Sequence, residues 1–207
     1  MATSTVFLCS LYTSALSLCA FCGYSLASTI VTTTYGPVNG SVISLSTNKT
    51  AITYLGIPFA KAERFESPVP PDEWTTILQA NKIDKICPQP NLGPNKLPLM
   101  SEECLLLNVY VPANATSSSA LPVMLWIHGG AFILGDTLGY DGSVLATEGN
   151  VVVVTAAYRL GVFGFLSSSS DNLKGNYGML DQIAAMKWVN KNIARYVMKY
   201  RHRSIRN

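Results

Sequence analysis

The chain has 207 residues, of which 48% are hydrophobic and 13% are charged. This composition excludes a disordered or fibrous protein and suits one domain of ordinary size. The formal net charge of +3 hides an uneven distribution of charge along the chain. Eight of the fifteen basic residues and all twelve acidic residues precede residue 187. The body is therefore mildly acidic, and the excess positive charge belongs to a short tail.

The first 27 residues have the composition of a signal peptide. Residues 6–26 are rich in Leu, Ala, Cys and Ser and carry no charge, and Ser25-Leu26-Ala27 supplies the small-x-small pattern of a signal peptidase site. Because no Lys or Arg precedes the apolar run, an uncleaved signal anchor is the alternative. We expect cleavage, secretion and no transmembrane span beyond this segment.

Removal of the signal leaves two cysteines, Cys87 and Cys104. This even count suits a single disulfide in an oxidising compartment. Three glycosylation sequons begin at Asn39, Asn48 and Asn114, which agrees with passage through the secretory pathway. Together with the signal, these features predict a secreted glycoprotein.

The amino-terminal part of the body predicts antiparallel strands. Short runs rich in Thr, Val and Ile at residues 30–35, 41–45 and 51–55 are separated by Gly, Pro and Asn, which is typical of a meander. Residues 66–100 are proline-rich and lack periodicity. They predict an ordered loop, provided that Cys87 and Cys104 close it.

The second half of the body predicts strands that alternate with helices. We expect strands at residues 105–111 and 151–154 and helices at residues 143–148 and 179–194. This alternation predicts an α/β sheet with both faces covered. Six residues mark the expected apolar side of the longer helix: Leu180, Ile183, Ala184, Met186, Trp188 and Ile193.

Residues 121–132 contain a strand that runs into a glycine turn. Five apolar residues, Val123–Ile127, lie between Pro122 and a His-Gly-Gly break and fit a strand covered on both faces. Gly129 and Gly130 permit positive φ and leave backbone N–H groups uncovered. Donors of this kind can hold a developing oxyanion. Taken alone, the stretch also fits an ordinary strand-to-helix turn.

Seven blocks of sequence stand in the order and at the intervals of a known family. They are Tyr54–Ala60, Arg64-Phe65, Ser101–Tyr110, His128–Phe132, Tyr140–Gly142, Tyr158–Leu166 and Gly175–Gln182. On these blocks the chain resembles the type-B carboxylesterases, the cholinesterase-like branch of the α/β-hydrolase fold, over residues 35–194. The resemblance implies an incomplete α/β-hydrolase fold, with the amino-terminal antiparallel strands and the first part of the central sheet.

The resemblance implies that Gly130 and Ala131 provide two backbone donors of an oxyanion hole, in a motif that begins with His128 and Gly129. His128 would shape the turn and is not the histidine of the catalytic triad. The resemblance further implies a disulfide and two buried structural ion pairs beside the site. The pairs are Cys87 with Cys104, Arg64 with Glu102, and Arg159 with Asp181.

Two departures from the family pattern concern the substrate. No aromatic residue lies between Cys87 and Cys104, where cholinesterases place the tryptophan that binds choline. This absence argues against a choline ester as the substrate. It favours a general small-molecule carboxylic ester as the substrate that a full-length relative would bind. Ala131 stands where the family motif can have a third glycine. Its methyl group would slightly narrow the acyl side of the substrate site. Neither a metal nor a cofactor is expected, and the sequence does not predict an oligomeric state.

The residues of a catalytic triad are missing from this sequence. It contains no Gly-x-Ser-x-Gly elbow, and its only other histidine, His202, lies in the basic tail. We therefore expect the amino-terminal portion of a secreted serine carboxylesterase, truncated before the nucleophile and inactive alone. The alternatives are a non-catalytic, cholinesterase-like adhesion or binding module and a regulatory or decoy fragment.

The expected domain organisation is a signal peptide at residues 1–27, the carboxylesterase portion at 28–194 and a basic non-family tail at 195–207. One codon choice for the start of the tail contains a splice-donor sequence, so we expect translated intron or a fragmentary gene model. Basic residues recur at four-residue intervals along the last helix and the tail, but like charges at this spacing weaken a helix. We expect no nucleic-acid partner. The recurring residues are Lys187, Lys191, Arg195, Lys199 and Arg203.

Overall fold

The computed structural model describes residues 29–91, 99–116, 119–168 and 173–196. The expected signal peptide, most of the basic tail and part of the loop between Cys87 and Cys104 therefore lie outside the described residues. No helix in these four ranges is long and apolar enough to cross a membrane.

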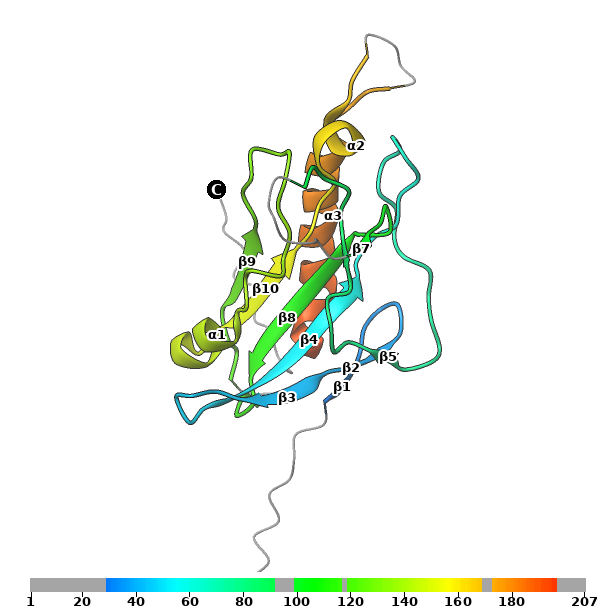
Figure 1. Ribbon diagram of the computed structural model, residues 1–207. Coiled ribbons are helices and arrows are strands. Elements are labelled where there is room, and N and C mark those ends of the chain that lie inside the picture. Colours follow the sequence, from blue (N-terminus) through cyan, green and yellow to red (C-terminus); the bar gives the residue numbers. More distant parts are fainter. Residues whose placement is uncertain (1–28, 92–98, 117–118, 169–172, 197–207) are drawn as a thin grey trace, which may run out of the picture.

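A mixed five-stranded sheet forms the centre of the molecule (Figure 1). Its order is β3 (Ser41–Ser44), β4 (Thr50–Pro58), β8 (Leu106–Pro112), β10 (Val152–Ala156) and β9 (Val123–Ile127). The first four strands are antiparallel neighbours, whereas β9 and β10 are parallel. The expected antiparallel start and the strand–helix alternation are both confirmed.

Two small sheets lie beside the central one. Strands β1 (Ile30–Thr32), β2 (Pro37–Asn39) and β5 (Leu78–Gln79) form the first. Strands β6 (Lys85–Ile86) and β7 (Leu99–Met100) pair in parallel and form the second. Apart from three two-residue strands, the described part of the proline-rich segment has no regular elements, as its composition predicts.

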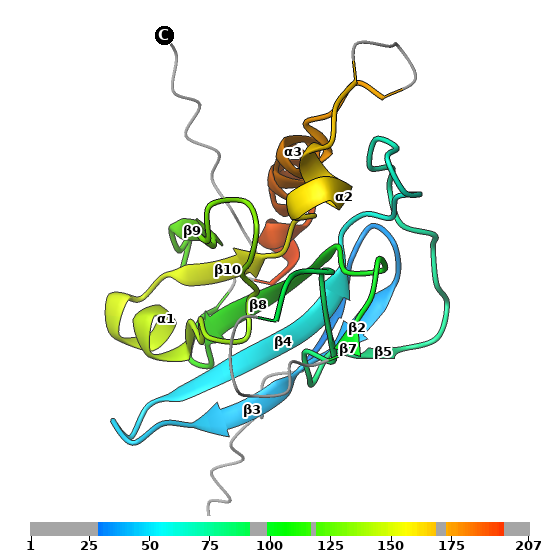
Figure 2. The ribbon, with the colours of Figure 1, turned by 45° about the horizontal axis from the view of Figure 1, so that its top comes forward.

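Helices cover both faces of the central sheet. Helix α3 (Tyr177–Asn192) lies along one face, where Trp188 and Val189 join a core that includes Val109 and Val154. Helix α1 (Ser143–Gly149) lies against the other face, where Ala146 packs with Tyr110 and Val153. Adjacent strand residues thus point to opposite helices, as a pleated strand requires. Figure 2 separates the two helical layers.

The expectation that the β9 stretch is covered on both faces is wrong for this chain. Strand β9 is an edge strand of the sheet, and its residues alternate between half-buried and exposed. Met124 is 48% exposed and Trp126 is 47% exposed. An apolar run suits a doubly covered strand, but coverage depends on which elements lie beside it, and on this face the described residues cover β9 only in part, with the Tyr140 ring 5.4 Å from that of Trp126.

The expected apolar side of α3 is also largely wrong. Trp188 and Ile193 are buried, but Ile183 and Met186 are 44% and 50% exposed. The helix turns Asp181 inward, because this carboxylate pairs with a buried arginine, and the rest of the buried face follows from that orientation. Asp181, Ala185, Trp188 and Asn192 thus lie on the buried face of α3, whereas Ile183 and Met186 lie away from it.

Two further features differ from expectation. Helix α2 (Gly161–Phe165) was not predicted, because it has five residues and two glycines and so shows no periodicity. The body extends past residue 194, through the 3₁₀ turn Ile193–Arg195. Tyr196 is only 9% exposed, and its ring meets the Tyr54 ring edge-on with centroids 4.8 Å apart. The first two residues of the expected tail therefore belong to the folded body.

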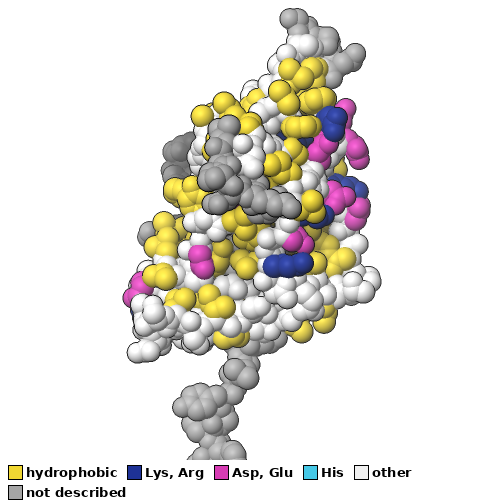
Figure 3. Space-filling model, in the orientation of Figure 1, with side chains coloured by type: hydrophobic (Ala, Val, Ile, Leu, Met, Phe, Trp, Pro, Cys, Tyr) yellow, Lys and Arg dark blue, Asp and Glu magenta, His cyan; other side chains and the backbone are white. Residues whose placement is uncertain are grey.

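The surface carries charge and apolar groups in different places. Figure 3 shows hydrophobic side chains spread over the face that it presents, with most charged side chains gathered along one side. The exposed apolar residues include Val144 and Leu145 of α1 as well as those of β9.

Candidate functional site

The turn after β9 has an unusual backbone. Gly130, Ala131, Phe132 and Gly135 all have positive φ, between 52° and 132°. A Cβ at Gly130 would overlap the carbonyl oxygen of Leu134, so only glycine fits there. For Ala131 and Phe132 the left-handed conformation costs about 1–3 kcal/mol each. The surrounding contacts must therefore hold this turn, residues 128–135, which we call the oxyanion turn after the role that the family resemblance implies.

The oxyanion turn leaves two backbone donors free. The carbonyl of Gly130 accepts hydrogen bonds from the N–H groups of Ile133 (3.0 Å) and Leu134 (3.2 Å), which closes the turn. The N–H groups of Gly130 and Ala131 have no acceptor among the residues that the structure describes. Ala131 is exposed and Gly130 is half-buried. This arrangement offers two neighbouring donors to an oxygen that carries negative charge.

His128 lies at the start of the oxyanion turn and is 3% exposed. Its Nδ1 is 2.9 Å from the carbonyl oxygen of Gly129, which can only accept, so the neutral ring carries its proton on Nδ1. Burial lowers the pKa of His128, and the Gly129 carbonyl and Asp136 oppose this only in part. Its Nε2 has no partner among the described residues. His128 is therefore a neutral residue that orders the turn.

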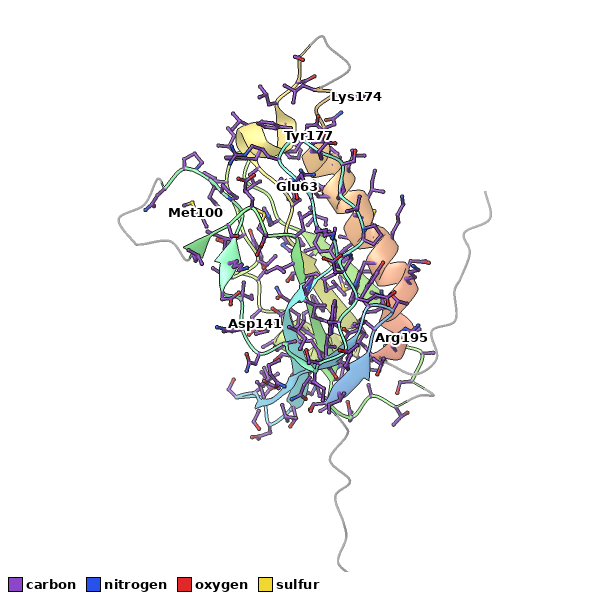
Figure 4. The ribbon with its side chains drawn as sticks, turned by 90° about the vertical axis from the view of Figure 1, so that its right-hand side faces the viewer. Glu63, Met100, Asp141, Lys174, Tyr177 and Arg195 are labelled. Atoms are coloured by element: carbon purple, nitrogen blue, oxygen red, sulfur yellow. A yellow bond between two sulfur atoms is a disulfide. The ribbon has the colours of Figure 1, made fainter. Side chains whose placement is uncertain are left out.

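Arg159 and Asp181 form a buried ion pair with two hydrogen bonds of 2.8 Å. The Asp181 carboxylate also accepts the backbone N–H of Arg159 at 3.0 Å. The guanidinium donates to the Glu63 carbonyl and lies 5.5 Å from the centre of the Tyr177 ring. Figure 4 shows Glu63 and Tyr177 beside one another where α3 begins. The pair thus anchors α3 to the segment that follows β10.

The second ion pair is exposed, which corrects the expectation that both are buried. Arg64 and Glu102 meet through the guanidinium Nη2 and Nε, but their side chains are 58% and 38% exposed. Hydrogen bonding to Arg64 lowers the pKa of Glu102. Because water surrounds both groups, this pair contributes little to stability.

Cys87 and Cys104 are joined in a disulfide, and both are buried. Two residues after Cys87, the Gln89 side chain forms two hydrogen bonds of 2.9 Å with the backbone of Gly135, at the end of the oxyanion turn. Sequence reasoning missed Gln89. The only local signal was a long amide side chain close to Cys87, and nothing in the sequence indicates that its partner lies 46 residues away.

The three sequons lie in different surroundings. Asn48 and Asn114 are exposed in turns, where a side chain is accessible for modification. Asn39 lies in β2, is half-buried and donates a hydrogen bond of 3.0 Å to Gln79.

One large groove among the described residues lies away from the oxyanion turn. A groove of about 710 Å³ lies between the loop after β4 and the start of β8, and neither Gly130 nor Ala131 lines it. Within the four described ranges, no group of three or more His, Cys, Asp or Glu side chains could hold a metal ion.

A sheet covered by helices on both faces, with free backbone donors after one of its strands, is the arrangement of an α/β hydrolase. The described elements form part of that fold. The sequence model of the carboxylesterase family matches residues 27–196, and the chain belongs to this family.

Individual relatives agree. Carboxylesterase 1E of Mus musculus is 43% identical over 201 residues, covering 87% of this chain and 36% of the relative. The para-nitrobenzyl esterase of Bacillus subtilis is 48% identical over 180 residues, covering 81% and 35%. The structure of a thermophilic para-nitrobenzyl esterase superposes with a TM-score of 0.74 at 44% identity, covering 82% of this chain and 36% of that one. The chain therefore spans about a third of the length of these relatives.

Proposed function

We propose that this chain supplies the oxyanion-hole portion of a carboxylic-ester hydrolase and does not hydrolyse esters by itself. The free N–H groups of Gly130 and Ala131, held at the end of a sheet strand, carry the proposal. When a nucleophile attacks an ester carbonyl, negative charge develops on the carbonyl oxygen. Donors fixed in advance stabilise that charge more than they stabilise the uncharged ester, and this difference lowers the barrier.

The chemistry of the attack has no candidate residue in this chain. An α/β hydrolase presents its serine on a Gly-x-Ser-x-Gly elbow, and the sequence contains no such motif. His128 cannot act as the general base of a triad in the observed arrangement, because its Nε2 is buried and no serine side chain is hydrogen-bonded to it. We therefore expect only the background rate of ester hydrolysis.

The proposed substrate class is a small-molecule carboxylic ester. The names of the relatives support this class, and none of them supports an adhesion or binding module. The absence of aromatic residues between Cys87 and Cys104 argues against a choline ester.

A chimera tests the proposal directly. Residues 28–196 of this chain would replace the matching part of the para-nitrobenzyl esterase of Bacillus subtilis. We expect the chimera to hydrolyse p-nitrophenyl acetate and the chain alone to show no rate above buffer. Gly130→Val should abolish the activity of the chimera, because a side chain there meets the Leu134 carbonyl. Gly139→Ala is the matched control, because a Cβ at Gly139 meets no atom.

Saturable hydrolysis by the chain alone would refute the proposed inactivity. A folded chimera that loses no activity on Gly130→Val would refute the assignment of the oxyanion turn. Circular dichroism would establish that each chimera is folded.

We further propose that the chain is secreted and glycosylated. Its amino-terminal composition, the two cysteines left after signal removal and the exposure of Asn48 and Asn114 support this. Expression in animal cells should place the protein in the medium with a mass that falls on endoglycosidase treatment. Asn48→Gln and Asn114→Gln should each reduce that shift, and Asn39→Gln should change it least, since the Asn39 amide is already hydrogen-bonded. Retention of an unmodified protein in the cytosol would contradict the proposal.

A further inference from the structure

Gln89 joins the disulfide region to the oxyanion turn. Its Nε2 donates to the carbonyl oxygens of Gly135 (2.9 Å) and Cys87 (3.2 Å), and its Oε1 accepts the N–H of Gly135 at 2.9 Å. The side-chain amide thus pairs with both backbone groups of one glycine. A single side chain thereby bridges two segments that are 46 residues apart in sequence.

Gly135 lies where a restraint on its backbone also restrains the beginning of the oxyanion turn. A Cβ at this position would overlap both the His128 ring and the Gly129 carbonyl, so the end of the oxyanion turn packs directly against its beginning. The beginning is held independently by Tyr158, whose hydroxyl donates to the His128 carbonyl at 3.0 Å. The middle is held by Gly161, whose N–H donates to the Phe132 carbonyl at 2.7 Å. The turn is therefore fastened at three points, and Gln89 holds the last of them.

The oxyanion turn depends on such external restraint. Four of its residues have positive φ, and two of these, Ala131 and Phe132, are not glycine. Side chains disfavour that conformation, so it persists only where neighbouring contacts impose it. Within the turn, the two backbone hydrogen bonds that the Gly130 carbonyl accepts and the contact of His128 Nδ1 with the Gly129 carbonyl are the internal hydrogen bonds among the described residues.

The disulfide in turn holds Gln89. Cys104 is fully buried two residues before β8 begins, and its carbonyl accepts the N–H of Leu106, the first residue of that strand, at 2.7 Å. The covalent link to Cys87 therefore fastens the Gln89 segment to the central sheet.

From these contacts we infer that Gln89 is the positioning residue of the oxyanion turn and that it carries the restraint of the Cys87–Cys104 disulfide to Gly130 and Ala131. The inference rests on the proposed function only in the role given to the turn. Gln89 acts through the backbone of Gly135 and touches no reacting atom. Loss of either the amide or the disulfide removes the restraint at Gly135, so the end of the turn opens more readily even though the Tyr158 and Gly161 contacts remain.

Amide hydrogen exchange of the ¹⁵N-labelled chain tests this inference without any ester hydrolysis. The reporters are the N–H groups of Ile133 and Leu134, which donate to the Gly130 carbonyl, whereas the hydrogen bonds of the Gln89 side chain go to Gly135 and Cys87. We expect Gln89→Ala to accelerate their exchange about tenfold or more, the change that follows from losing one or two net hydrogen bonds. Amide exchange in β8 and β10 should stay unchanged, because the substitution does not affect the hydrogen bonds between those strands. Gln182→Ala is the matched control, since the Gln182 side chain, in α3, makes no hydrogen bond to any other described residue.

Gln89→Glu separates the two bonds, because a carboxylate still accepts from Gly135 but cannot donate to its carbonyl. We expect an exchange rate between those of the parent chain and Gln89→Ala. A double-mutant comparison then tests the coupling to the disulfide. The paired change Cys87→Ala with Cys104→Ala should accelerate Ile133 and Leu134 as Gln89→Ala does, and combining all three changes should add nothing further.

Unchanged exchange at Ile133 and Leu134 in Gln89→Ala would overturn the positioning role. Additive effects of the cysteine and glutamine changes would overturn the coupling. Should the cysteine variant fail to keep protected β8 amides, oxidised and reduced parent chain would replace it in the same comparison. Because the readout is exchange, a failure here is distinct from a failure of the chimera to hydrolyse an ester.

Discussion

The phenol of Tyr158 donates a hydrogen bond of 3.0 Å to the backbone oxygen of His128, and the two rings stack with centroids 4.5 Å apart. His128 directly follows β9, and Tyr158 follows β10 by two residues. The contact therefore joins the carboxyl ends of two parallel neighbours. In open α/β sheets this is the edge at which ligands bind. The pair fastens the oxyanion turn to an interior strand of the sheet.

The substitution Tyr158→Phe should measure how much the hydrogen bond from Tyr158 to the His128 carbonyl contributes to the free energy of unfolding. The change keeps the stacked ring but leaves the His128 carbonyl without its donor, at a buried position. We expect the free energy of unfolding in urea to fall by about 1–3 kcal/mol. Tyr140→Phe is the control, because Tyr140 is 40% exposed, and it should change the value by less than about 0.5 kcal/mol. Equal effects of the two changes would contradict the role of the hydrogen bond.

Stability should depend on pH through His128. Burial lowers its pKa below the ordinary 6.5, so the unfolded chain takes up a proton at a higher pH than the folded chain does. The contribution is therefore fully present above about pH 6.5 and is lost as the pH falls below that value. The lowered pKa values of Glu102, Glu103 and Glu148 act in a separate window, below their ordinary 4.5.

Thermal melts of the parent chain at about pH 7.5, 6.5 and 5.5 would check this expectation. We expect Tm to fall toward pH 5.5 and the fall to be smaller in His128→Gln. His202→Gln should leave the fall unchanged. The same slope in the parent chain and in His128→Gln would show that other groups cause it.

The two ion pairs should differ sharply in their effect on stability. Asp181 is fully buried and Arg159 is 4% exposed, so Asp181→Asn leaves a buried guanidinium without its counter-charge. We expect this change to cost about 3–5 kcal/mol of the free energy of unfolding. Glu102→Gln, at the exposed pair with Arg64, should cost about 0–1 kcal/mol. Similar costs in urea denaturation would contradict the difference in burial.

The exposed edge of β9 should cause self-association. An edge strand with apolar, outward-pointing side chains is a template for pairing with another chain. We expect sedimentation velocity to show concentration-dependent association of this chain, reduced when Met124 and Trp126 are both replaced by Lys. Val144→Lys with Leu145→Lys is the matched control, because those residues are equally exposed but lie on α1. A chain that stays monomeric, or that responds equally to both pairs of changes, would contradict this prediction.

Local sequence was sufficient to predict the bounds of a strand or helix where turn-forming residues lie at both of its ends. Strand β8 was expected at 105–111 and lies at Leu106–Pro112, and α1 was expected at 143–148 and lies at Ser143–Gly149. Both have a clear period or a β-branched run that turn residues interrupt. Local pattern did not predict α2, which is too short to show a period, or the buried face of α3, on which Asp181 pairs with a residue far away in sequence.

The sequence by itself determined the family, the glycine turn after β9 and the absence of a nucleophile elbow, because each depends on residues adjacent in the chain. Only the tertiary structure decided that Arg64 and Glu102 meet in water, that His128 is buried and neutral, and that β9 is an edge strand. The same holds for the contact between Gln89 and Gly135. Burial, charge environment and distant hydrogen-bond partners arise from the packing of segments far apart in sequence, and no local pattern specifies them.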